Sequence, residues 1–177
     1  ASAQDFTIDD FNVNIFINKD SSFTVKETIS VDFHLPRHGI YSEIPFIYTD
    51  TLGRNFRTPT EILSVTDGSG NKLNAKTEHT GSIVKIRIGD PNITVTGRQK
   101  YEIFYKVENA IMFFDDHDEL YWNVTGNYWK AMIKNAKCTV SLADGLKSTN
   151  YWASCFTGKT GSTETACRYK TSNNFTE

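Results

Sequence analysis

Several features that would indicate a function are scarce in this sequence. Its longest apolar runs, such as 110–114, fall far short of the roughly 20 residues that a membrane-spanning helix needs. The 21 acidic and 19 basic residues are interspersed, and the formal net charge of -2 leaves no basic surface for nucleic acid or an anionic membrane. The middle of the chain is poor in proline and glycine and contains no linker, so we expect residues 1–177 to form a single domain.

Catalytic motifs are scarce as well. The histidines are scattered, and no G-x-S-x-G motif for a nucleophilic serine occurs. Carboxylate pairs such as Asp118 with Glu27 or Glu43 would serve glycoside cleavage only at a suitable separation, which the sequence does not give. We therefore predict a protein that is not an enzyme, with no catalytic residue and no cofactor. A hydrolase acting on envelope glycans or peptides is kept as an alternative.

The three cysteines are few enough to be considered one by one. Cys155 and Cys167 bracket a segment rich in glycine, serine and threonine that is typical of a long hairpin connection, and we predict a disulfide between them. Closing this loop stabilises the fold by roughly 3 kcal/mol in the chain-entropy model. Cys138 shares a strand face with Val140 and Leu142, which predicts a buried free thiol. The alternative is that all three cysteines are reduced core residues.

Alternation of apolar and polar residues dominates what is present. In 23–35 the odd positions are apolar except Glu27, as expected of a long half-buried strand, and 11–17, 84–88 and 101–107 follow the same pattern. Turn residues separate these runs, so we predict an all-β fold, an antiparallel β-sandwich of roughly nine to eleven strands. Only 127–136 is compatible with a helix, and we expect one short helical turn there, near Trp129.

Glu27 is the exception on its strand face. A carboxylate buried there needs a cationic or hydrogen-bonding partner, and Arg37 is one candidate. The alternative is that the strand bulges, or reaches the rim of the sheet, at Glu27.

An acidic run follows the strand at 101–107. Asp115, Asp116, Asp118 and Glu119 place four carboxylates within five residues, which suits a hard cation such as calcium if the loop folds around it. The run lacks the spacing of an EF-hand loop, so a solvated acidic loop is the alternative.

The three tryptophans each follow a tyrosine. Because neighbouring strand residues point to opposite faces, one ring of each pair is a candidate for exposure. Trp122, Trp129 and Trp152 are therefore candidate ligand-binding residues that would stack on sugars or anchor a protein partner. Packing in the core is the alternative.

Four separate motifs together resemble the N-terminal domain of YciQ-like predicted membrane proteins, a bacterial domain of unknown function. They are Thr24-Val25-Lys26-Glu27-Thr28-Ile29, His38-Gly39-Ile40-Tyr41-Ser42-Glu43-Ile44-Pro45, Ile88-Gly89-Asp90-Pro91 with Gly97 and Tyr101-Glu102-Ile103-Phe104-Tyr105-Lys106-Val107, and Asp118-Glu119-Leu120-Tyr121-Trp122-Asn123-Val124-Thr125-Gly126 with Trp129. The resemblance runs from about Asp9 to Cys167. Ser42 stands where the family usually has an arginine, so any ion pair of that arginine is absent or is supplied by another residue such as Arg37.

The resemblance implies an extracytoplasmic, β-rich domain of an exported protein that has a membrane-spanning segment further on. Residues 1–3 fit the end of a signal peptide or a remnant of an expression vector, and the polar residues up to Glu177 lead us to expect that the natural chain continues. We expect an interaction or sensing domain at the cell surface or in the periplasm, tethered to the membrane, that recognises a protein or an envelope component such as a glycan. A carbohydrate-binding module is the second alternative.

Overall fold

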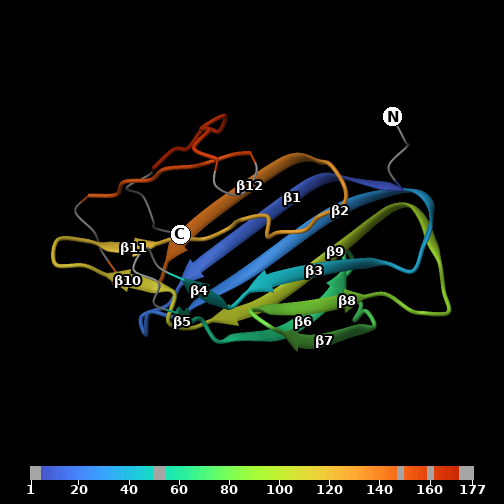
Figure 1. Cartoon of the computed structure of the whole chain (residues 1–177), viewed down its shortest axis with the longest axis horizontal. Coiled ribbons are helices and arrows are strands. Elements are labelled where there is room, and N and C mark those ends of the chain that lie inside the picture. The colour runs from blue at the N-terminus through green and yellow to red at the C-terminus, as the bar shows by residue number, and fades with distance from the viewer. Residues whose placement is uncertain (1–4, 50–54, 147–149, 159–161, 172–177) are drawn as a thin grey trace. The chain divides into compact units, whose positions relative to one another are not determined.

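The computed structural model describes residues 5–49, 55–146, 150–158 and 162–171, and these residues form strands, turns and irregular segments (Figure 1). Contacts divide the chain into two units, Ala1–Ser141 and Leu142–Glu177. The described residues contain no helix, and hence none that could span a membrane. The all-β prediction is therefore confirmed.

The larger sheet of unit 1 has five strands in the order β12-β1-β2-β9-β6. Their bounds are β1 Phe6–Ile17, β2 Phe23–Arg37, β6 Thr60–Asp67, β9 Val95–Val107 and β12 Ile133–Leu142. The pairs β1–β2, β2–β9 and β6–β9 are antiparallel, as expected.

The pairing of β12 with β1 differs from the other pairings in the sheet. Asn135 donates from its side-chain amide to the carbonyl of Asp9, and Ser141 donates from its hydroxyl to the carbonyl of Ile15. Since both residue numbers rise together, β12 runs parallel to β1, and the arrows in Figure 1 point the same way. The sheet is therefore mixed, with a parallel strand at one edge.

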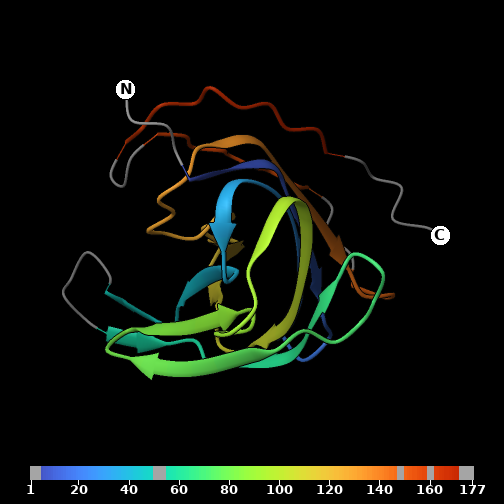
Figure 2. The same ribbon diagram turned by 90° about the vertical axis from the view of Figure 1, so that its right-hand side faces the viewer.

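Three smaller sheets complete the strands. The order β3-β8-β7 forms a three-stranded sheet, and β4–β5 and β10–β11 form two-stranded ones. Their bounds are β3 Ile40–Pro45, β4 Ile47–Thr49, β5 Asn55–Arg57, β7 Ala75–Thr80, β8 Ile83–Ile88, β10 Ile111–Phe113 and β11 Asp118–Leu120. Figure 2 shows β3, β8 and β7 beside one another.

Every second residue is buried along the central strands, as expected where one face of a sheet packs against a core. In β2 the odd residues from Phe23 to Phe33 are buried, and the odd residues of β9 from Tyr101 to Val107 are buried on the same face. Alternate residues of β3 and β8 are also buried. Side chains from these four strands and from β1 belong to a single hydrophobic core cluster.

Two expectations within unit 1 are wrong. The segment around Trp129 has no helical residue, because Gly126 and Tyr128 have positive φ values of 69° and 68° that interrupt a right-handed helix. Cys138 is exposed, because β12 is an edge strand on which residues 134–140 are all exposed. Alternation places Cys138 on one face but does not require that face to be covered.

Unit 2 contains the predicted disulfide. Cys155 and Cys167 are bonded, with their Cα atoms 6.2 Å apart. Between them Thr157 and Glu164 form an antiparallel bridge in which the Thr157 amide donates to the Glu164 carbonyl at 2.7 Å. The predicted disulfide is therefore present, and the described residues of the expected hairpin show this one bridge.

Candidate functional site

Glu27 and Tyr105 form a buried hydrogen-bonded pair. In the register of β2 and β9, Val25 lies opposite Tyr105 and Glu27 opposite Ile103, so Glu27 and Tyr105 are diagonal neighbours on the buried face. The Tyr105 hydroxyl donates to Glu27 Oε1 at 2.7 Å. Glu27 is only 5% exposed, and Tyr105 is fully buried.

Burial controls the ionisation of this pair. Loss of solvation raises the pKa of Glu27 to about 7, although the hydrogen bond from Tyr105 acts in the opposite direction. Burial and the neighbouring carboxyl group raise the pKa of Tyr105 well above its ordinary value. The tyrosine is therefore a permanent donor, and the carboxyl group titrates near neutral pH.

Trp122 completes the Glu27 cluster, by which we mean Glu27, Tyr105 and Trp122. Its ring packs edge-on against Phe23 at 5.1 Å and lies 6.4 Å from the Tyr105 ring, between centroids. Trp122 Nε1 and Glu27 Oε2 are both buried without a hydrogen-bond partner among the described residues. Each such atom costs about 1–3 kcal/mol in the folded state.

The hydrogen-bonding partner expected for a buried Glu27 is Tyr105, and the candidate Arg37 is wrong. Arg37 pairs with Asp5 instead. The pairing of β2 with β9 is regular from Phe23 to Phe33, so Glu27 does not lie at a bulge either. The sequence feature that could have indicated the true partner is Tyr105, a residue with a hydroxyl group on the apolar face of β9.

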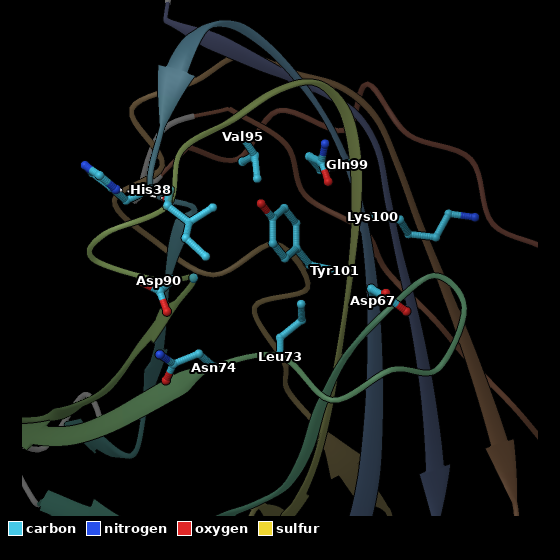
Figure 3. A pocket seen from close by; sticks show the side chains of 11 residues that line it. His38, Asp67, Leu73, Asn74, Asp90, Val95, Gln99, Lys100 and Tyr101 are labelled. Atoms are coloured by element: carbon cyan, nitrogen blue, oxygen red, sulfur yellow. Dashed lines mark hydrogen bonds between the residues drawn. The ribbon is translucent and has the colours of Figure 1, made fainter.

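A cavity of about 190 Å³ lies elsewhere in unit 1 (Figure 3). Figure 3 shows the Tyr101 ring in the middle of it, with Val95 and Leu73 on either side. The polar residues that line it are His38, Asp67, Asn74, Asp90, Gln99 and Lys100. Its lining residues come from the turn before β3, the end of β6 and the segment after it, the loop after β8, and β9.

Two glycines hold one wall of this cavity in place. Gly39 and Gly89 have φ values of 128° and 131°, which only glycine adopts readily. A Cβ on Gly39 would lie 1.9 Å from the carbonyl oxygen of Ile88. The two chain segments therefore touch through their backbones, and this contact positions His38 and Asp90.

The acidic run spans the connection between β10 and β11, which holds Asp115 and Asp116, and the start of β11, which holds Asp118 and Glu119. His117 Nδ1 lies 2.7 Å from an Asp116 carboxylate oxygen, and its Nε2 lies 3.8 Å from a Glu119 carboxylate oxygen. Two of the four acidic residues therefore have this histidine as a partner, which the sequence did not indicate. Asp115 and Asp118 are exposed. In the part of the chain that the structure describes, no three or more acidic, histidine or cysteine side chains are grouped to hold a metal ion. Calcium binding stays a prediction.

The three tryptophans lie in different environments. Trp122 packs as described above, and Trp129 packs edge-on against Phe11 while its Nε1 donates to the Thr125 carbonyl. Trp152, in unit 2, is 84% exposed. The structure therefore presents one of the three rings to solvent.

These features define an all-β domain with a buried, titratable carboxyl group and a small cavity. The chain belongs to the family described as predicted membrane protein (DUF2207) N-terminal domain, whose model matches residues 7–176. It is 28% identical over 157 residues to the uncharacterized protein YciQ of Escherichia coli, a match that covers 86% of this chain. The chain spans only 25% of the length of that relative.

Solved structures offer weaker likenesses. An M1 zinc metallopeptidase from Deinococcus radiodurans is 7% identical with a TM-score of 0.38, and the match covers 59% of this chain and 21% of that one. Yeast LTA4 hydrolase in complex with bestatin is 12% identical with a TM-score of 0.41, over 60% of this chain and 15% of that one. Both scores are too low to carry an argument about this chain.

Proposed function

We propose that this chain is a non-catalytic extracytoplasmic domain of a membrane-anchored bacterial protein, and that it recognises a protein or another envelope component. The observation that carries the proposal is the disulfide between Cys155 and Cys167, because disulfides persist in oxidising compartments. Membership of a family of predicted membrane proteins supports the membrane anchor.

The proposed domain is an antiparallel β-sandwich apart from the parallel edge strand. Buried side chains of β2 and β9 in the five-stranded sheet belong to the same core cluster as those of β3 and β8 in the three-stranded sheet. Two sheets that share one core are what a sandwich requires. Such a scaffold presents loops at its ends for recognition.

Two alternatives have less support. A carbohydrate-binding module needs several exposed coplanar rings, whereas Trp122 and Trp129 pack against the core and Trp152 is exposed. A hydrolase needs two carboxyl groups that converge on one opening. Glu27, the buried candidate for such a pair, is hydrogen-bonded to Tyr105 instead.

Cysteine labelling in cells tests the location. The full-length protein, with any cysteine outside this chain replaced by serine, is treated with a membrane-impermeant maleimide while the cytoplasmic membrane is intact. Cys138 is exposed and free, so we expect one label before reduction and three after reduction and unfolding. Although the residue is exposed, neighbouring atoms partly desolvate its thiol and raise the pKa of Cys138 to about 11, so labelling is slower than for an ordinary cysteine.

The matched control is Cys138→Ser, which removes the label seen before reduction and keeps the two that appear afterwards. Labelling of Cys138 only after the cytoplasmic membrane is lysed would place the domain in the cytoplasm. Labelling of Cys155 and Cys167 without a reductant would show that the disulfide does not form in the cell. Either result overturns the proposal.

A further inference from the structure

The cavity around Tyr101 has the features of a built binding site. Tyr101 is only 5% exposed, and its ring packs edge-on against Phe33 at 6.5 Å, so its orientation is fixed. Figure 3 shows the ring inside the cavity with its hydroxyl directed toward the space near Val95. No described residue provides a hydrogen-bond partner for that hydroxyl.

The ionisation of Tyr101 defines what it offers a ligand. Burial raises the pKa of its phenol to about 12, so the group remains protonated at every physiological pH. A protonated phenol whose hydroxyl faces a cavity is a hydrogen-bond donor. The phenol oxygen can also accept a hydrogen bond, but its single proton needs an acceptor in the ligand, such as a carbonyl oxygen.

The walls define the rest of the ligand. Leu73, Ile93 and Val95 are aliphatic, and Ile93 is 61% exposed at the opening. A volume of about 190 Å³ suits a group of side-chain size, since cavities that hold drug-sized ligands measure roughly 300–1,000 Å³. An aliphatic group fits these walls better than a sugar, which needs an exposed aromatic face.

The two carboxylates that line the cavity already accept hydrogen bonds from their own turns. The Asp67 carboxylate accepts hydrogen bonds from the backbone amides of Ser69 and Asn71, and Asp90 accepts one from Asn92. Figure 3 shows Lys100 pointing away from Tyr101. No charged side chain of the lining is therefore directed at the Tyr101 hydroxyl, and a neutral group is favoured.

The walls are also fixed before a ligand arrives. The turn that carries Asp67 is closed by its hydrogen bonds to Asn71, and His38 is hydrogen-bonded to the Ile93 carbonyl at 3.0 Å. The backbone contact of Gly39 and Gly89 holds the remaining wall. Little ordering is left to occur on binding, which favours affinity.

We propose that this cavity binds a neutral branched aliphatic group that carries a carbonyl oxygen, with Tyr101 donating to that oxygen and Leu73, Ile93 and Val95 enclosing the aliphatic part. The inference rests on the proposed role of the domain in recognition and names the chemistry that is recognised. A free small ketone or amide supplies this chemistry, and so does a leucine within a peptide.

Titrations of the chain followed by amide chemical shifts test the proposal. The probes are isobutyl methyl ketone, as a free small molecule, and N-acetyl-leucine N-methylamide, as a peptide. N-acetyl-glycine N-methylamide is the control probe that lacks the aliphatic group. We expect saturable shifts at Asn74, Gly89 and Gln99 in the millimolar range with at least one of the first two probes. Binding of the ketone alone identifies a small-molecule site, and binding of the leucine probe identifies a peptide site.

Three variants make the test specific. Tyr101→Phe removes only the hydroxyl and is expected to weaken binding about fivefold, the value of one net hydrogen bond. Ile93→Asp changes an exposed side chain at the opening and is expected to abolish saturation. Leu35→Asp makes the same change at an exposed residue outside the lining and is expected to bind as the original chain does.

Three results would overturn the inference: no saturable shift with either aliphatic probe, equal shifts with the glycine probe, or equal loss in Leu35→Asp and Ile93→Asp. Undiminished binding by Tyr101→Phe would overturn the role of its hydroxyl. Cysteine labelling reports the location of the domain independently of these titrations, so failure of the cavity proposal and failure of the proposed function are separate outcomes.

Discussion

The buried carboxyl group of Glu27 makes the stability of unit 1 depend on pH in a direction opposite to that of most acidic residues. Its pKa rises from 4.5 in the unfolded chain to about 7 in the folded one. The folded state therefore holds the proton more tightly. The stabilising contribution is complete below pH 4.5 and is lost as the pH rises through about 7.

The size of the effect follows from the same two values. One pH unit between the two pKa values corresponds to about 1.4 kcal/mol, so the free energy of unfolding falls by about 3 kcal/mol between pH 4.5 and pH 8. Small domains are stable by roughly 5–15 kcal/mol in total, so this change is a large fraction of the whole. It shifts a urea midpoint by an amount that is easily measured.

The assay compares the original chain with Glu27→Gln in urea at a series of pH values. Glutamine has nearly the same shape, accepts the hydrogen bond from Tyr105 and carries no ionisable proton. A Trp152→Phe background restricts the fluorescence signal to Trp122 and Trp129, which lie in unit 1. We expect the two chains to be equally stable near pH 4.5 and Glu27→Gln to be the more stable at pH 8 by about 3 kcal/mol.

The contributions of other titrating groups to the pH dependence cancel when the free energies of unfolding of the two chains are subtracted. His117, whose pKa is raised by Asp116, adds a slope of the same sign in both chains and cancels. Glu61→Gln, at an exposed position of β6, is the matched control and is expected to keep the original pH dependence. Tyr105→Phe removes the hydrogen bond that lowers the pKa of Glu27, so the loss of stability should move to higher pH. Parallel curves for the original chain and Glu27→Gln would refute the reasoning.

Two further predictions concern Gly39 and the acidic loop. Gly39→Ala places a Cβ against the Ile88 carbonyl and should lower the free energy of unfolding, measured in urea, by at least about 2 kcal/mol. The control Gly70→Ala should cost less, because Gly70 also has a positive φ but has open space around it. Equal costs would contradict the backbone contact. Since the described acidic groups are not arranged to hold a metal, we expect the same melting temperature in millimolar calcium and in chelator. A rise that Asp118→Asn abolishes would instead support calcium binding by the acidic run.

The sequence was sufficient to predict most strands of unit 1 because their alternation reports which side chains are buried. Alternation of apolar and polar residues predicted the strand that contains Glu27, and the polar segment between Cys155 and Cys167 predicted their disulfide. The helical prediction at 127–136 failed because β12 begins at Ile133 and positive φ values precede it. Apolar spacing alone could not distinguish the two outcomes.

The candidate site was harder to predict because it depends on register between distant strands. Glu27 and Tyr105 are 78 positions apart, and nothing in either motif states that they lie diagonally across β2 and β9. The cavity depends on a meeting of Gly39 with Gly89, which is also set by tertiary contact. Cys138 was misplaced for a related reason, since alternation assigns a face without showing whether another element covers it.

The motifs that carry the family resemblance describe the scaffold more than the ligand. Glu27, Tyr105 and Trp122 come from three different motifs and meet in the core, and Gly39 and Gly89 come from motifs that touch through the backbone. Ile93 and Leu73, which line the proposed binding cavity, lie outside the motif segments. Kinship therefore predicts the core, the backbone crossing and the Tyr101 hydroxyl in a related chain, while the aliphatic walls of the proposed site depend on side chains outside the motifs.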